Sequence, residues 1–115
     1  MVLDAQSPRL DRIRLAASSN IWRLLMQFMI VEQFRNADPL PIYRRFRDHG
    51  RLAPEGLRYI ASWVDEALER CFQIMETDDR RLLDQWIENW SDIADFQVFP
   101  IMSSKEAADK VAPRL

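Results

Sequence analysis

An acidic residue interrupts an otherwise apolar stretch near the start of the chain. Glu32 lies within LMQFMIVEQF, residues 25–34, where its neighbours are apolar or uncharged. A carboxyl group in such surroundings either pairs with a cation or has a raised pKa, and a raised pKa suits it to proton transfer. Glu32 is therefore our candidate catalytic residue, as a general acid or base. The structural alternative is an ion pair with Arg58 or Arg70, or exposure at a strand end.

Further along the chain, two groups of residues have the types that a small-molecule pocket needs. Aromatic rings supply flat apolar walls with a few polar groups. The aromatic candidates for substrate binding are Tyr43, Tyr59, Trp63 and Trp86. Arg51, Arg70 and Gln73 are the candidates for holding a carboxylate or an enolate oxygen. Packing in the core or at a dimer interface is the alternative for the aromatic residues, and ion pairs at strand edges for the polar ones. Arg51 follows a predicted helix end, where it could instead satisfy helix carbonyls.

Other catalytic chemistry is restricted by the rarity of cysteine and histidine. The single Cys71 and the single His49 exclude a disulfide framework and a zinc finger. Cys71 lies in a predicted strand in which Arg70 points to the other face, so a buried structural thiol is favoured over a nucleophile. His49 suits the end of a surface helix better than it suits ligation of haem iron. We expect no metal and no cofactor.

The composition is that of one soluble globular domain. The 115 residues are 48% hydrophobic and 30% charged, with a net charge of -2. No apolar run is long enough for a transmembrane helix, and Gly50 and Gly56, the two glycines, are too few for a phosphate-binding loop. The 18 acidic residues are interspersed with 16 basic ones, whereas nucleic-acid binding needs a basic stripe. We expect neither a nucleic acid nor a membrane as partner.

Residues 1–24 differ from the rest of the chain. They contain no sustained apolar block and no small-residue cleavage site, so a secretory signal is not predicted. Asp4 and Asp11 argue against an organelle presequence, which avoids acidic residues. We expect residues 1–24 to form an extension, either flexible or a short helix, before a single domain over residues 25–115. The expected location is the cytoplasm.

Strand and helix patterns alternate from residue 25 onward. Apolar and alternating runs predict strands over residues 25–34, 57–64, 70–77 and 96–102. Asp38 followed by Pro39 predicts a helix that ends near Gly50. A second helix begins at residues 77–79 and carries an apolar stripe that consists of Leu82, Leu83, Trp86, Trp90 and Ile93. A capping box from Ser103 to Glu106 opens a short helix that runs through residue 111.

This order of elements predicts the fold. A strand, helix, strand, strand, helix, strand sequence gives a ferredoxin-like α+β sandwich, in which a four-stranded antiparallel sheet carries two helices on one face. A short C-terminal helix follows. Because most strands are apolar on both sides, the uncovered sheet face needs a partner. A second copy of the chain is the simplest partner, so we expect a homodimer.

Several segments resemble a family of short bacterial proteins described only as a domain of unknown function. The similar segments are MQFMIVEQF, YRRFRDHGRLAPEGLRYIASWV, RCFQIMETDD and DFQVFPIMSSKEA, within about residues 26–112. Members begin near Met26, which implies that residues 1–24 are an extension. The family is similar in architecture to dimeric α+β barrels, a superfamily of cofactor-free monooxygenases, lactone isomerases, cyclases, haem-degrading enzymes and stress-response proteins. The resemblance implies the fold and the dimer, but a fold does not select the reaction.

Three functions remain open at this point. The chain is a cofactor-independent enzyme of isomerase, cyclase or monooxygenase type that acts on a small apolar or aromatic metabolite, a non-catalytic ligand-binding subunit, or a structural interaction module. A closed pocket of roughly 300 Å³ or more, on which Glu32 and an arginine converge, would favour the first two, and a filled core the third. Turnover would separate the enzyme from the binding subunit.

Overall fold

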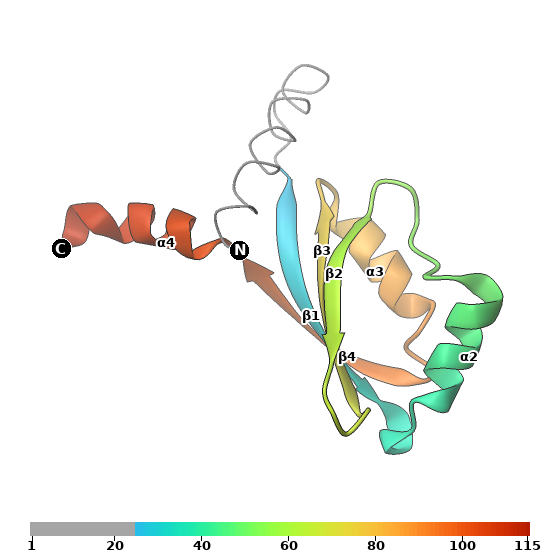
Figure 1. Cartoon of the computed structure of the whole chain (residues 1–115). Coiled ribbons are helices and arrows are strands. Elements are labelled where there is room, and N and C mark those ends of the chain that lie inside the picture. The colour runs from blue at the N-terminus through green and yellow to red at the C-terminus, as the bar shows by residue number, and fades with distance from the viewer. Residues whose placement is uncertain (1–24) are drawn as a thin grey trace. The chain divides into compact units, whose positions relative to one another are not determined.

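The computed structural model of the chain describes residues 25–115, so the predicted extension over residues 1–24 lies outside the described residues. The strands and helices of this part follow the predicted order (Figure 1). They are β1 (Met26–Phe34), α2 (Leu40–His49), β2 (Arg58–Val64), β3 (Arg70–Thr77), α3 (Arg80–Glu88), β4 (Ala94–Ile101) and α4 (Ser104–Val111). Short 3-10 turns cover Arg35–Ala37 and Ala112–Arg114.

Four strands form one sheet in the order β2-β3-β1-β4, and β3 pairs antiparallel with both β1 and β2. Helices α2 and α3 lie on the same side of this sheet (Figure 1). This arrangement is the predicted ferredoxin-like α+β sandwich. Met26–Pro100 form one compact unit, and Ile101–Leu115 belong to a second unit. Within residues 25–115, no helix is long and apolar enough to cross a membrane.

The core lies between the sheet and the two helices. Ile30 of β1, Met75 of β3 and Leu83 of α3 have no solvent exposure, and Trp86 has almost none. Removing such a side chain from water contributes about 1.5–3 kcal/mol each. The packing therefore fixes which sheet face lies under the helices, and this face also carries Glu32 and Gln73.

Helix α2 begins one residue later than predicted and ends as predicted. Its first backbone amide, that of Leu40, donates to Asp38 Oδ1 at 3.0 Å, and Pro39 precedes it. Gly50 follows the last turn with a φ of 73° and a ψ of -160°, a conformation that side chains disfavour. The chain therefore turns sharply here and directs Arg51 back toward the sheet, where its side chain contacts Gln73.

Helix α3 is shorter than the apolar stripe predicts. Asp79 caps it by accepting a hydrogen bond from the Arg81 backbone amide, and the helix ends at Glu88. Trp90 and Ile93 remain in the apolar layer, but they lie in the tighter turns that follow, where the Trp90 amide donates to the Ile87 carbonyl. These turns bring the Trp90 indole against the loop after α2.

An irregularity in β2 separates two aromatic residues that simple alternation places on one face. The register shifts between Tyr59 and Ala61, which is the signature of a β-bulge. Tyr59 lies opposite the buried Met75, whereas Trp63 lies opposite Phe72. Tyr59 therefore faces the helices and Trp63 faces away from them, although regular alternation over residues 57–64 would place both on one face.

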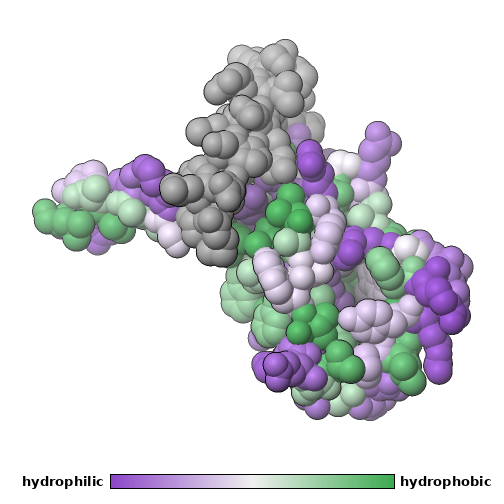
Figure 2. Space-filling view, viewed as in Figure 1, coloured by the Kyte–Doolittle hydropathy of each residue, from purple (hydrophilic) through white to green (hydrophobic). Residues whose placement is uncertain are grey.

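The other sheet face is apolar at its centre. Met29 pairs with Ile74 and Val31 pairs with Phe72, and all four side chains are only partly covered. The indole of Trp63, beside Phe72, is 57% exposed. Figure 2 shows hydrophobic side chains in patches beside polar ones on the visible surface. We call the sheet face that faces away from the helices the open face. It is formed by Met29, Val31, Trp63, Phe72 and Ile74.

Helix α4 begins with the predicted capping box. The Ser103 side chain accepts from the Glu106 amide, and the Glu106 carboxylate accepts from the Ser103 amide. An exposed ion pair between Lys105 and Asp109, four residues apart, supports the same helix.

Candidate functional site

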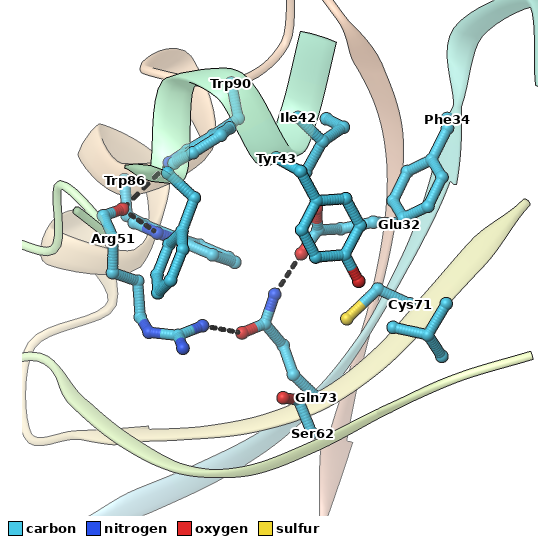
Figure 3. A pocket seen from close by; sticks show the side chains of 12 residues that line it. Glu32, Phe34, Ile42, Tyr43, Arg51, Ser62, Cys71, Gln73, Trp86 and Trp90 are labelled. Atoms are coloured by element: carbon cyan, nitrogen blue, oxygen red, sulfur yellow. Dashed lines mark hydrogen bonds between the residues drawn. The ribbon is translucent and has the colours of Figure 1, made fainter. Parts of the chain in front are cut away.

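A cavity of about 240 Å³ lies between α2 and the helix-covered face of the sheet. Residues from β1, α2, β2, β3 and α3 and from the loop after α2 line it (Figure 3). The predicted site residues that line it are Glu32, Tyr43, Arg51, Gln73 and Trp86. Its volume is below the roughly 300 Å³ that served as the criterion for a small-molecule pocket, but Glu32 and an arginine do converge on it.

Two buried polar side chains meet on the sheet side of this cavity. Glu32 is 4% exposed and Gln73 is 2% exposed. Glu32 lies directly opposite Cys71 in the β1–β3 ladder, so Gln73, two residues further along β3, points to the same face. Gln73 Nε2 donates to Glu32 Oε1, while Gln73 Oε1 accepts from Arg51 Nη1 at 2.9 Å. Figure 3 shows these three side chains as one chain of hydrogen bonds.

Burial dominates the electrostatics of Glu32. It raises the pKa of the Glu32 carboxyl from 4.5 to about 7, against the opposing effects of the Arg51 charge and the Gln73 hydrogen bond. Both protonation states are therefore populated near neutral pH, as a group that accepts and returns protons requires. Within the described part of the chain, Gln73 is the one hydrogen-bond donor to this carboxyl. The second carboxyl oxygen therefore remains available to a bound molecule.

The thiol and the phenol that line the cavity are neutral at neutral pH. Burial, with a smaller contribution from the nearby Glu32 charge, raises the pKa of the Cys71 thiol to about 12, against the opposing effect of the Arg51 charge. Burial also raises the pKa of the Tyr43 hydroxyl, with smaller contributions from Cys71 and Glu32. Cys71 is therefore an unreactive thiol in the cavity wall, and Tyr43 is a neutral hydrogen-bond donor.

Side chains from the end of α3 hold the loop that carries Arg51. The Arg51 carbonyl accepts from the indole nitrogens of Trp86 at 3.0 Å and Trp90 at 2.9 Å. Asn89 Nδ2 donates to the next carbonyl, that of Leu52, at 3.1 Å. Leu52 itself has a φ of 61°, which costs a residue with a side chain about 1–2 kcal/mol. The three donors thus stabilise a strained loop. We call the two indole donors, Trp86 and Trp90, the indole clamp.

The guanidinium group of Arg51 packs against two aromatic rings. Its central carbon lies 3.7 Å from the Tyr59 ring centroid and 5.3 Å from that of Phe46. Both contacts are cation–π interactions. Among the residues that the structure describes, Arg51 forms no ion pair. The alternative in which its side chain caps α2 is wrong, because that side chain reaches Gln73 instead.

Three predicted site residues do not line the cavity. The Tyr59 ring packs against the Arg51 guanidinium, and its hydroxyl forms a 2.8 Å hydrogen bond with Ser62 Oγ. Trp63 is on the open face because of the bulge in β2. Arg70 pairs in register with Gln33 and forms an ion pair with Asp65 at 3.1 Å. The predictions that these three residues line this cavity are therefore wrong.

The structure also excludes the ion pairs that were the structural alternative for Glu32. Arg58 lies opposite Glu76, which faces away from Glu32, and Arg70 is on the open face. The cation that lowers the pKa of Glu32 is Arg51, which lies in a loop rather than in a strand.

Sequence reasoning missed several residues of the cavity wall. These are Phe34, Ile42, Phe46, Ser62, Val64, Cys71 and Trp90. Alternation along β1 and β3 could have found Phe34 and Cys71, because they share a face with Glu32 and Gln73. The β2 residues depend on the bulge, which no local pattern indicated.

The fold and this cavity define a ferredoxin-like α+β protein with a small site between helix and sheet. A family model matches residues 26–115, so the chain belongs to the family called Domain of unknown function (DUF3303). Neither a curated protein nor a solved structure gives a significant match.

Proposed function

We propose that this protein binds a small aromatic or apolar metabolite in the cavity and that Glu32 moves a proton in a cofactor-independent reaction. The observation that carries this proposal is the buried Glu32 carboxyl. One of its oxygens is held by Gln73, the other is available, and its pKa is about 7. A carboxyl that served packing alone would cost stability without return, because burial disfavours its charged form.

The arrangement fits a proton-transfer isomerisation. The Glu32 carboxylate takes a proton from a substrate C–H bond, and the bond's electron pair stays on the substrate as an enolate. The same carboxyl then returns the proton to another carbon, so no electrons leave the substrate. Arg51 and the neutral Tyr43 hydroxyl line the same cavity and can stabilise the transient negative charge.

The cavity volume limits the substrate to one ring with short substituents. An apolar cavity of about 150 Å³ holds benzene, and the space here is about 240 Å³. The walls include Ile42, Phe46 and Trp86, which offer apolar and aromatic surface. A single ring with a polar substituent directed at Glu32 and Arg51 fits both the volume and the walls.

We further propose that this protein forms a homodimer of the dimeric α+β barrel type. Two copies would pack their open faces together, which would bury Trp63, Phe72 and their apolar neighbours. The cavity lies on the opposite side of the sheet, so each copy would keep its own site. The resemblance to dimeric barrels supports this proposal. The cytoplasm remains the proposed location.

A retained ligand and a hydrogen-exchange assay test the proposed reaction. Native mass spectrometry of protein purified from the organism that encodes it would identify a bound small molecule. Incubating that molecule with the protein in D₂O should then exchange a substrate C–H for deuterium, at a rate that rises with pH through about 7 as Glu32 ionises.

Glu32→Gln should abolish this exchange and leave the ligand bound. Glu55→Gln is the matched control, because Glu55 is exposed in a loop. Undiminished exchange in Glu32→Gln would show that this carboxyl is not the proton carrier. A ligand that binds but never exchanges would identify a non-catalytic binding protein.

A further inference from the structure

We propose that the substrate is a small aromatic carboxylate, whose anionic group binds Arg51 while its reacting carbon lies at Glu32. This inference rests on the proposed function, because it names the chemical class of molecule that the same cavity takes. Three features of the site support this inference. They are an arginine without an ion pair, the contacts that hold this arginine in place, and its spacing from Glu32.

The first feature is an uncompensated cation in a partly enclosed space. Glu32 and Arg51 are the charged residues among those that line the cavity. Arg51 uses one N–H on Gln73, and no described carboxylate pairs with it. A guanidinium has five N–H donors, so several remain for a ligand. A partly desolvated arginine gains more from an anion than from a neutral group.

The second feature is that the arginine is fixed before any ligand binds. Its guanidinium lies over the rings of Tyr59 and Phe46, which restrict its position. The indoles of Trp86 and Trp90 hold its backbone carbonyl. Preorganisation reduces the entropy lost on binding, and a planar guanidinium matches a carboxylate with two parallel hydrogen bonds. This geometry favours a planar anion over a point charge or a neutral amide.

The third feature is the distance between the two charged groups. The amide group of Gln73 spans the gap between Arg51 and Glu32, contacting one at each end. A molecule bound alongside this amide can place its carboxylate on Arg51 and a carbon a few bonds away at Glu32. An aromatic ring attached to that carbon would then contact the walls formed by Ile42 and Trp86. Phenylacetate has this arrangement of ring, carbon and carboxylate.

Three probes of equal size and different charge test the inference. Phenylacetate, phenylacetamide and 2-phenylethylamine are titrated against the full chain by calorimetry at millimolar concentrations. Trp86 and Trp90 line the cavity, so tryptophan fluorescence gives a second readout. We expect phenylacetate to bind about tenfold or more tightly than phenylacetamide, because the carboxylate forms charge-assisted hydrogen bonds. The amine should bind most weakly.

Variants of Arg51 link this preference to the proposed residue. Arg51→Gln should make phenylacetate and phenylacetamide bind alike, and Arg51→Lys should keep only part of the preference. Both variants retain the backbone carbonyl that the indole clamp binds, and circular dichroism checks that they fold. Arg47→Gln is the matched control, because Arg47 is exposed on α2 and pairs with Asp48. This control should bind all three probes as the unmodified protein does.

The outcomes separate the two proposals. If phenylacetate and phenylacetamide bind equally well to the unmodified protein, or if Arg51→Gln keeps the preference, the carboxylate inference is overturned while the cavity stays a small-molecule site. Tightest binding of the amine overturns the inference in the same way. If none of the three probes binds, both the inference and the proposed site fail.

Discussion

At the scale of single residues, the buried Glu32 carboxyl lowers the free energy of unfolding when it is ionised. Its carboxyl has a pKa of about 7 when folded and an ordinary value of 4.5, so the folded chain holds the proton more tightly than the unfolded chain. Stability from this group is therefore fully present below about pH 4.5 and falls as pH rises toward 7. Above pH 7 the full cost of a buried charge remains.

Replacing Glu32 by glutamine should remove this cost. Glu32→Gln keeps an oxygen that can accept from Gln73, and we expect it to stabilise the fold at pH 8 by about 3 kcal/mol, which corresponds to the change in pKa. At pH 4 the gain should vanish. Urea denaturation of both chains at the two pH values measures the difference, with Glu55→Gln as an exposed control. An equal gain at both pH values would refute the raised pKa.

At the scale of elements, the site depends on the end of one helix holding the loop after another. Trp86 and Trp90 donate to the same carbonyl of Arg51, and Asn89 donates to the next one. The proposed site therefore depends on α3 and the turn after it for the position of Arg51.

Removing one indole N–H from the clamp should weaken the arginine's placement. Trp90→Phe keeps a ring but loses the hydrogen bond to Arg51, and we expect it to cost about 1 kcal/mol of stability. It should also reduce the preference for phenylacetate over phenylacetamide, because Arg51 is less fixed. Denaturant unfolding and probe titration measure the two effects. Trp63→Phe, on the open face, should leave the preference unchanged, and loss of preference there would contradict this assignment.

The elements were predictable where the signal is local, and the site was predictable only in part. Asp79 and Ser103 mark helix starts through their own caps, and Glu32 stands out within its own strand. The bulge near Ile60 leaves no such trace, because Leu57–Val64 alternates regularly as written. The approach of Trp90 to Arg51 joins residues 39 positions apart, so no local spacing encodes it.

At the scale of the whole molecule, the open face makes the proposed dimer testable. The Trp63 indole is 57% exposed beside Phe72, so Trp63→Glu should leave the subunit folded. In the dimer the new carboxylate would be buried without a partner, at a cost of several kcal/mol. Light scattering at micromolar concentration should then report a monomer instead of a dimer.

Leu40→Glu is the matched control for this experiment. Leu40 is 54% exposed at the start of α2, where an acidic residue suits the helix dipole. This variant should remain a dimer, as the unmodified chain should. A monomeric unmodified chain would refute the dimer, and dissociation by Leu40→Glu would place the interface on the helices instead.

The bulge in β2 has an evolutionary consequence. It lets one short strand give Tyr59 to the cavity side and Trp63 to the open face, only four positions apart. Residues of the two surfaces therefore alternate along the sequence, and each set can accumulate substitutions without changing the other. Deleting Ile60 would remove the bulge, but each remaining residue of β2 could keep its partner on β3, so Tyr59 and Trp63 would stay on opposite faces of the sheet. Within the family, we therefore expect members that lack this residue to keep the same two surfaces.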